Sequence, residues 1–122
     1  DEDFFLYWED IYLMKKINNT DYKMLVAKNV FAKHEGGKSS DNSSEVNYIR
    51  SQNFIFGEFL YDFKLKKLRF IKIVRKFLQN FLLFLFNIFI FELKQSINNF
   101  AKVHGIVKFI LFYLRNFSFI KK

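Results

Sequence analysis

Residues 1–40 read DEDFFLYWEDIYLMKKINNTDYKMLVAKNVFAKHEGGKSS, and this stretch decides which fold we expect. An aromatic and apolar run leads into two adjacent carboxylates, Glu9 and Asp10, and a lone histidine, His34, follows two short apolar segments. This order predicts a candidate proton acceptor and a candidate metal ligand at the ends of regular elements, where an active site holds its side chains.

Regular elements are expected on both sides of a turn at residues 18–21. Over residues 9–18 the spacing predicts a helix, whose apolar stripe comprises Ile11, Leu13, Met14 and Ile17. Residues 22–27 and 30–33 are short apolar runs beside turn signals, which predicts two short strands. Residues 35–44, EGGKSSDNSS, have the composition of a loop and mark an internal boundary.

Charge is distributed unevenly along the 122 residues. Residues 1–62 carry 7 Lys or Arg and 11 Asp or Glu, whereas residues 63–122 carry 13 Lys or Arg and the single acidic residue Glu92, which together give the net charge of +8. A basic half that is also apolar indicates an anionic partner surface, either lipid or nucleic acid. The absence of cysteine excludes disulfides, thiolate catalysis and Cys-based zinc sites.

The second half of the sequence predicts helices from residue 45 onward. Residues 64–76, KLKKLRFIKIVRK, alternate basic residues with apolar ones spaced by three, which is typical of a basic amphipathic helix on a membrane surface. Residues 77–91 contain no charge. As a helix they would extend about 22 Å, less than the roughly 30 Å of a bilayer core, so we expect an interfacial, re-entrant or buried helix.

The carboxylates Glu9 and Asp10 allow two interpretations. Carboxylates at the start of a helix are stabilised by free N–H groups and by the helix dipole, so the pair has a purely structural explanation as an N-cap. Alternatively, one of them is a general base that takes a proton from a sugar hydroxyl. The preceding aromatic run, which includes Tyr7 and Trp8, would then line a partly dry pocket and stack on the sugar ring.

His34 is followed closely by two glycines, Gly36 and Gly37. A single histidine after a strand is more often structural than a ligand, but glycines allow a phosphate or a sugar to approach the backbone closely. A divalent ion at His34 needs further ligands, and the sequence points to no specific set.

Residues 1–40 resemble the C-terminal part of the catalytic domain of family 2 glycosyltransferases, especially the bacterial rhamnosyltransferase-like members. The matching pieces are DEDFFLYWEDIYL, DYKMLVAKNVFAKH and HEGGKSS. The resemblance implies an α/β fold of the GT-A type, a Rossmann-like domain that transfers sugar with inversion from a nucleotide-diphospho-sugar to an acceptor hydroxyl. It also implies that Asp10 is the catalytic base with Glu9 beside it. His34 then closes the site of a divalent metal, Mg²⁺ or Mn²⁺.

The sequence also departs from the family pattern. Tyr12 stands where the family usually has Asp, and Lys28 stands where Pro is common. The family's nucleotide-binding half, with its own D-x-D motif, has no counterpart in these residues. We therefore expect a C-terminal fragment that is inactive alone.

Residues 1–44 are thus expected to form the C-terminal part of a GT-A catalytic domain, and residues 45–122 a helical, membrane-associated tail. The expected function is sugar transfer to a saccharide or lipid-linked acceptor in bacterial cell-surface polysaccharide synthesis, at the cytoplasmic face of the inner membrane. A non-enzymatic membrane-associated helical module explains residues 63–122 equally well. Residues 64–76 also have the charge to contact nucleic-acid phosphates, but no recognisable nucleic-acid-binding fold accompanies them, so we expect no such partner.

Overall fold

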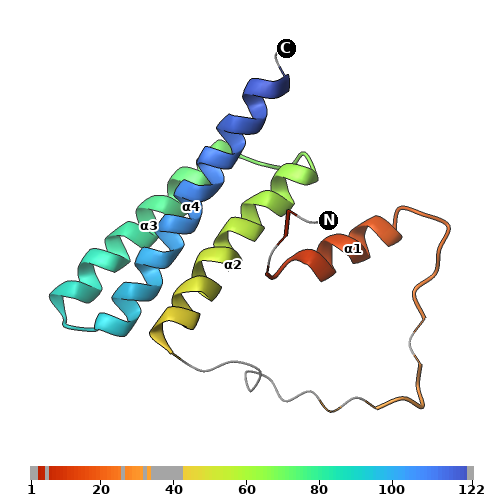
Figure 1. The fold of residues 1–122 in the computed structure, drawn as a ribbon, viewed down its shortest axis with the longest axis horizontal. Helices are drawn as coiled ribbons and strands as arrows, with labels where there is room; N and C mark the ends of the chain where they lie inside the picture. The colour runs from red at the N-terminus through yellow and green to blue at the C-terminus, as the bar shows by residue number, and fades with distance from the viewer. Residues whose placement is uncertain (1–2, 5, 26, 32, 34–42, 121–122) are drawn as a thin grey trace.

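The regular elements in the part of the chain that the structure describes are four helices. Figure 1 shows how they are arranged. The computed structural model describes residues 3–4, 6–25, 27–31, 33 and 43–120. Helices were expected over residues 9–18 and from residue 45 onward, and both predictions are confirmed. The helices are α1 (Glu9–Ile17), α2 (Ser44–Lys64), α3 (Phe70–Phe89) and α4 (Leu93–Ile120).

The helices α2, α3 and α4 pack as a bundle in which α4 lies between the other two (Figure 1). Tyr48, near the start of α2, meets Phe100, and Phe63, near its end, meets Tyr113, so α2 and α4 run parallel. α3 runs antiparallel to both (Figure 1). The centre of the bundle consists of fully buried side chains from α2 and α4, namely Phe59, Leu60, Ile106 and Phe109.

α2 and α4 approach closely because α4 carries small residues where the two helices cross. Ala101 and Gly105 are both buried at this crossing. A Cβ atom on Gly105 would lie 2.3 Å from the carbonyl oxygen of Gln52, so no larger residue fits without a backbone shift. The close approach lets aromatic side chains interlock farther along, and the ring centroids of Phe59 and Phe109 are 5.4 Å apart.

α2 begins and ends at well-defined caps. The hydroxyl oxygen of Ser43 accepts a hydrogen bond from the backbone N–H of Val46 at 3.2 Å. At the other end Lys66 has a φ of 56°, and the backbone N–H of Lys67 donates to the carbonyl oxygen of Asp62 at 2.8 Å, which is a Schellman stop. The predicted continuous basic helix over residues 64–76 is therefore wrong, because the chain turns between Lys64 and Phe70.

Carboxylates of α2 pair with lysines of α3 between the two helices. Lys72 Nζ lies 2.6 Å from Asp62 Oδ2 and 2.8 Å from Glu58 Oε1, and Lys76 Nζ lies 3.4 Å from Glu58 Oε2. Burial alone would lower the pKa of Lys72, but hydrogen bonds and charges from Asp62 and Glu58 outweigh it and raise that pKa above its ordinary value of 10.5. These pairs hold the start of α3 against the end of α2.

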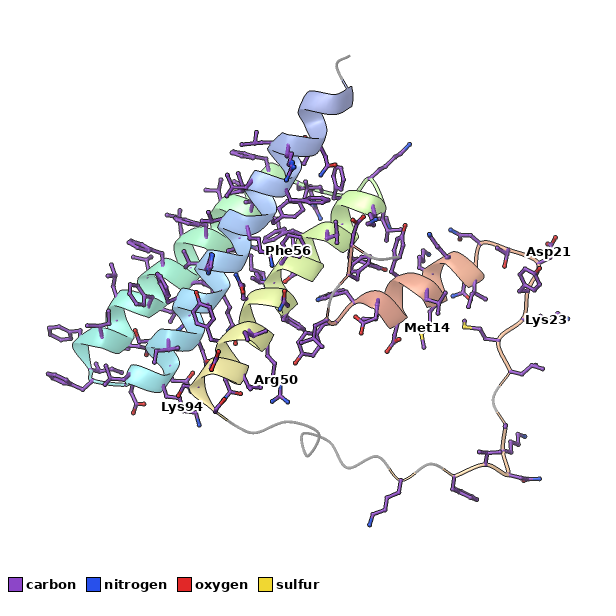
Figure 2. All side chains as sticks on the ribbon, viewed as in Figure 1. Met14, Asp21, Lys23, Arg50, Phe56 and Lys94 are labelled. Carbon is purple, nitrogen blue, oxygen red and sulfur yellow. The ribbon has the colours of Figure 1, made fainter. Side chains whose placement is uncertain are left out.

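The expected α/β fold is wrong: the part of the chain that the structure describes contains helices and no strand. Residues 22–27 and 30–33, predicted as strands, have exposed side chains where they are described, and Phe31 is 94% exposed. Figure 2 shows Asp21, just before this segment, and Lys23, within it, away from the bundle that contains Phe56. A strand needs a neighbouring strand for its backbone groups and a surface that buries its apolar side chains, and the described residues of this segment have neither.

The uncharged residues 77–91 form most of α3 and the turn after it. Their outward side chains are exposed, and Phe89 is 81% exposed. None of the helices in the described residues is both long and apolar enough to span a bilayer. The exposed apolar side chains along this face include Leu78, Leu82, Leu85, Phe86 and Phe89.

Candidate functional site

The first turn of α1 lines a small cavity that contains both predicted carboxylates. Glu9 and Asp10 occupy that turn, where the helix dipole favours negative charge. The N-cap position belongs to Trp8, whose side chain makes no capping hydrogen bond, so neither carboxylate is the N-cap residue. The cavity holds about 190 Å³ and is lined by Phe4, Glu9, Asp10, Tyr12, Leu13 and Lys16.

Trp8 holds the start of α1 against α2. Its indole N–H donates a hydrogen bond to the carbonyl oxygen of Phe54 at 3.0 Å. Its ring packs beside Phe54 and Tyr61, with centroid distances of 5.6 and 5.4 Å. The indole lies over Gly57, where a Cβ atom would come within 2.8 Å of Trp8 Cδ1, so the missing side chain at Gly57 makes room for the ring.

Two consecutive residues with positive φ, Tyr7 at 68° and Trp8 at 70°, turn the chain sharply into α1. This backbone conformation costs about 1 to 3 kcal/mol for each bulky residue. Contacts with α2 offset the cost, since Tyr7 also meets Phe54 edge to face at a centroid distance of 5.6 Å. Tertiary packing, not local preference, therefore positions the first turn of α1.

Lys64 ties the other wall of the cavity to the end of α2. Its Nζ lies 2.6 Å from Asp3 Oδ2 and 5.8 Å from the ring centroids of both Phe4 and Tyr12. Phe4 is buried, and its ring centroid is 5.2 Å from that of Tyr12. The two rings form one wall of the cavity next to the carboxylates, and the ammonium group of Lys64 packs beside both rings.

Glu9 and Asp10 are exposed at this cavity. Neither side chain forms a hydrogen bond or an ion pair with another residue that the structure describes. Lys16, which also lines the cavity, places its ammonium group 4.8 Å from the ring centroid of Tyr12. Carboxylate oxygens in this position are available to accept a hydrogen bond or a proton from a bound hydroxyl group.

The rings that line the cavity differ from those that the sequence predicts as substrate contacts. Tyr7 and Trp8 pack against α2, whereas Phe4 and Tyr12 line the cavity. A sequence signal for Tyr12 exists, because it follows Glu9 by three residues and the two share one face of α1. Phe4 has no such signal, since its position depends on the turn before the helix.

The remaining predicted site residues, His34, Gly36 and Gly37, lie outside the described residues. The role of His34 at a divalent metal site therefore stays a prediction. Where the chain is described, no three His, Asp or Glu side chains converge on one metal position. These residues do not fit a divalent ion on their own, and we derive no chemical step through one.

Comparison with known proteins gives no match to a family model, to a curated protein or to a solved structure. The resemblance of residues 1–40 to family 2 glycosyltransferases is thus carried by the sequence pattern alone. Function has to be inferred from the cavity at α1 and from the surfaces of the helical bundle.

Proposed function

We propose that this chain forms the acceptor side of an inverting glycosyltransferase, in which the cavity at α1 binds a saccharide and Asp10 is the catalytic base. The observation that carries the proposal is the lining of the cavity, where two carboxylates meet the rings of Phe4 and Tyr12. Sugars suit such a site, because their faces pack on aromatic rings while their hydroxyl groups bind carboxylates. The resemblance of residues 1–40 supports the same activity.

The size of the cavity favours a single sugar unit. Its volume of about 190 Å³ lies below the roughly 300–1,000 Å³ of pockets that enclose a drug-sized ligand. A nucleotide-diphospho-sugar is too large for this cavity, so we assign the cavity to the acceptor. His34, the ligand predicted for the divalent ion, lies outside the described part of the chain. The nucleotide-binding half of the family has no counterpart in residues 1–40, so donor binding is assigned to no residue of this cavity.

In the proposed reaction Asp10 takes the proton of the acceptor hydroxyl while the hydroxyl oxygen bonds to the anomeric carbon of the donor sugar. The bond from that carbon to the nucleotide diphosphate breaks, and the diphosphate leaves with the electron pair. Attack from the face opposite the leaving group inverts the anomeric configuration. Glu9 holds a second carboxylate in the same cavity, where it binds a neighbouring hydroxyl of the acceptor.

The proposal includes a location at the cytoplasmic face of the inner membrane, where a lipid-linked acceptor is within reach. Two features of the bundle support the membrane-binding part of this location. Basic residues flank the turn between α2 and α3, and the outward face of α3 exposes large apolar side chains. Lys and Arg beside an apolar surface are typical of segments that bind anionic membranes.

The exposed face of α3 also favours a second candidate function, a non-enzymatic membrane-associated helical module. Such a module needs only α2, α3 and α4, and it makes no use of the cavity at α1. It therefore predicts that substitutions of Glu9 and Asp10 change no activity of the protein.

Asp10→Asn in the full-length enzyme tests the proposed function. Asn keeps the shape of Asp but accepts no proton, so we expect sugar transfer to fall by at least about 100-fold while donor binding is retained. Transfer of a radiolabelled sugar and calorimetry of donor binding provide the two readouts. Glu9→Gln is the matched control, expected to raise the acceptor KM more than it lowers kcat. Near-normal turnover of Asp10→Asn would remove Asp10 from this role.

A further inference from the structure

A basic cavity lies at the corner where α2 leads into α3. It holds about 380 Å³ and is lined by Asp62, Lys67, Arg69, Ile71, Lys72 and Arg75. Four of these residues are cations and one is a carboxylate, and Lys72 already binds that carboxylate at 2.6 Å. The cavity therefore carries a surplus of positive charge, which favours an anionic ligand.

Three of the cations are available to bind an anionic ligand. Lys67, Arg69 and Arg75 form no ion pair with a carboxylate of the described chain, whereas Lys72 is held by Asp62 and Glu58. The two guanidinium groups present forked N–H donors that match phosphate oxygens. Arg69 also leaves the first turn of α3 without a side-chain cap, which adds partial positive charge at the same place.

An apolar cavity lies on the other side of the start of α3. It holds about 270 Å³. Residues 69, 71, 72 and 75 line the basic cavity, while residues 68, 70 and 73 line the apolar one, so the first turns of α3 separate the two. The apolar cavity is lined by Leu68, Phe70 and Ile73 and, from α4, by Phe109, Ile110 and Tyr113 among others.

Two large apolar side chains beside these cavities are exposed. Phe70 is 77% exposed and Ile71 is 71% exposed. Exposed apolar residues among Lys and Arg are typical of segments that enter a membrane interface, with the cations at the phosphates and the apolar groups below them. A nucleic acid would use the cations but would leave Phe70, Ile71 and the apolar cavity without a role.

From these features we infer that the start of α3 is a binding site for an anionic phospholipid. The phosphate group occupies the basic cavity at Lys67, Arg69 and Arg75, and an acyl chain of the same lipid enters the apolar cavity at Phe70 and Ile73. Free phosphate is also an anion but leaves the apolar cavity unfilled. The inference is independent of sugar transfer, and it adds a site for one lipid molecule to the proposed membrane location.

Vesicle binding by the complete chain tests this site. The probes are vesicles of phosphatidylcholine alone and vesicles that also contain phosphatidic acid, with the bound fraction measured by flotation. The test variant replaces the three cations proposed to bind the phosphate group by glutamine, K67Q/R69Q/R75Q. The matched control removes the same charge from exposed positions away from the cavity, K15Q/K23Q/K28Q. Circular dichroism verifies that both variants keep their helices.

A cation at an anionic membrane surface contributes about a five-fold change in affinity, so we expect the test variant to bind phosphatidic acid vesicles roughly 100-fold more weakly. The control variant should lose less than about 10-fold. Equal losses in the two variants would overturn the inference, because they would show attraction by overall charge without a site. The same conclusion would follow if the protein bound both kinds of vesicle equally.

Phe70→Ala examines the apolar half of the site and separates a lipid from free phosphate. We expect it to weaken vesicle binding several-fold while leaving the affinity for inorganic phosphate, followed by NMR shifts of the residue 67–75 amides, unchanged. If inorganic phosphate binds as tightly as the vesicles and Phe70→Ala has no effect on either, the ligand is free phosphate and the lipid inference is wrong. Because Asp10→Asn is read out by sugar transfer and K67Q/R69Q/R75Q by vesicle binding, failure of one proposal leaves the other testable.

Discussion

Gly105 of α4 lies directly against the backbone of α2 at Gln52, where a Cβ atom on the glycine would come within 2.3 Å of the Gln52 carbonyl oxygen. One turn earlier, Ala101 is fully buried at the same crossing. These small residues set the distance between the two helices. At that distance the hydroxyl oxygen of Tyr48 reaches His104 Nδ1 at 2.6 Å.

Gly105→Ala is expected to destabilise the bundle. Helix propensity alone would favour alanine by about 1 kcal/mol, but the added methyl group forces two backbones apart, which costs about 1 to 3 kcal/mol and more where the backbone cannot yield. Urea denaturation measures the free energy of unfolding. Val107→Ala, at a partly exposed position of the same helix, is the control and should change it by less than about 1 kcal/mol. A Gly105→Ala variant more stable than the parent would contradict the close crossing.

Gly57→Ala is expected to displace Trp8 from α2, because the new Cβ atom would lie 2.8 Å from the indole ring. Trp8 is the single tryptophan of the chain, so its emission reports this contact directly. We expect a red-shifted emission and stronger quenching by acrylamide, with little loss of helical circular dichroism. Emission identical to that of the parent protein would show that the indole does not lie over Gly57 in solution.

Helices were predictable from residue spacing, and strands were not. The hydrogen bonds of a helix are internal, so the pattern of residues 9–18 contains most of what determines α1. Strand formation depends on a partner strand, and no local pattern in residues 22–27 shows whether one exists. The end of α2 could not be predicted from the sequence either, because the alternation of basic and apolar residues continues through Lys66. The positive φ of Lys66 ends the helix without the glycine that is usual at this position.

The candidate site was predictable only in part. The adjacent carboxylates Glu9 and Asp10 are a local feature, and both line the cavity. Phe4 joins them because the chain turns sharply at Tyr7 and Trp8, where two bulky aromatic residues have positive φ. The backbone preferences of bulky residues disfavour a positive φ, so the turn results from packing on α2. No local pattern in the sequence therefore predicts it.

Lys72→Met is expected to destabilise the protein at neutral pH by about 1 to 3 kcal/mol, because Asp62 and Glu58 both lose the ammonium group of Lys72 and Glu58 retains the more distant one of Lys76. The pKa of Lys72 is raised in the folded state, so its contribution is fully present below the ordinary value of 10.5. It is lost as the pH rises through the higher pKa of the folded state. The difference in unfolding free energy between parent and variant should therefore shrink at strongly alkaline pH.

The control for the lysine experiment is Lys94→Met, which removes an exposed ammonium group at the start of α4. General titration of lysines and tyrosines affects the parent and this variant alike, so their difference should stay small and independent of pH. A Lys72→Met deficit that persists undiminished at alkaline pH would show that the ammonium charge is not what stabilises the junction of α2 and α3.

In the full-length enzyme, Tyr12→Ala is expected to weaken acceptor binding while leaving the chemical step nearly unchanged, because the ring lines the cavity while Asp10 takes the proton. Loss of an aromatic contact of about 0.5 to 1.5 kcal/mol corresponds to a rise of about two- to twelve-fold in the acceptor KM. Tyr12→Phe keeps the ring face and should restore the KM, which separates stacking from hydrogen bonding. Tyr22→Ala, at an exposed position outside the cavity, should leave both kinetic constants unchanged. A large fall in kcat at constant KM would mean that the acceptor does not bind against this ring, and the cavity at α1 would lose its proposed role.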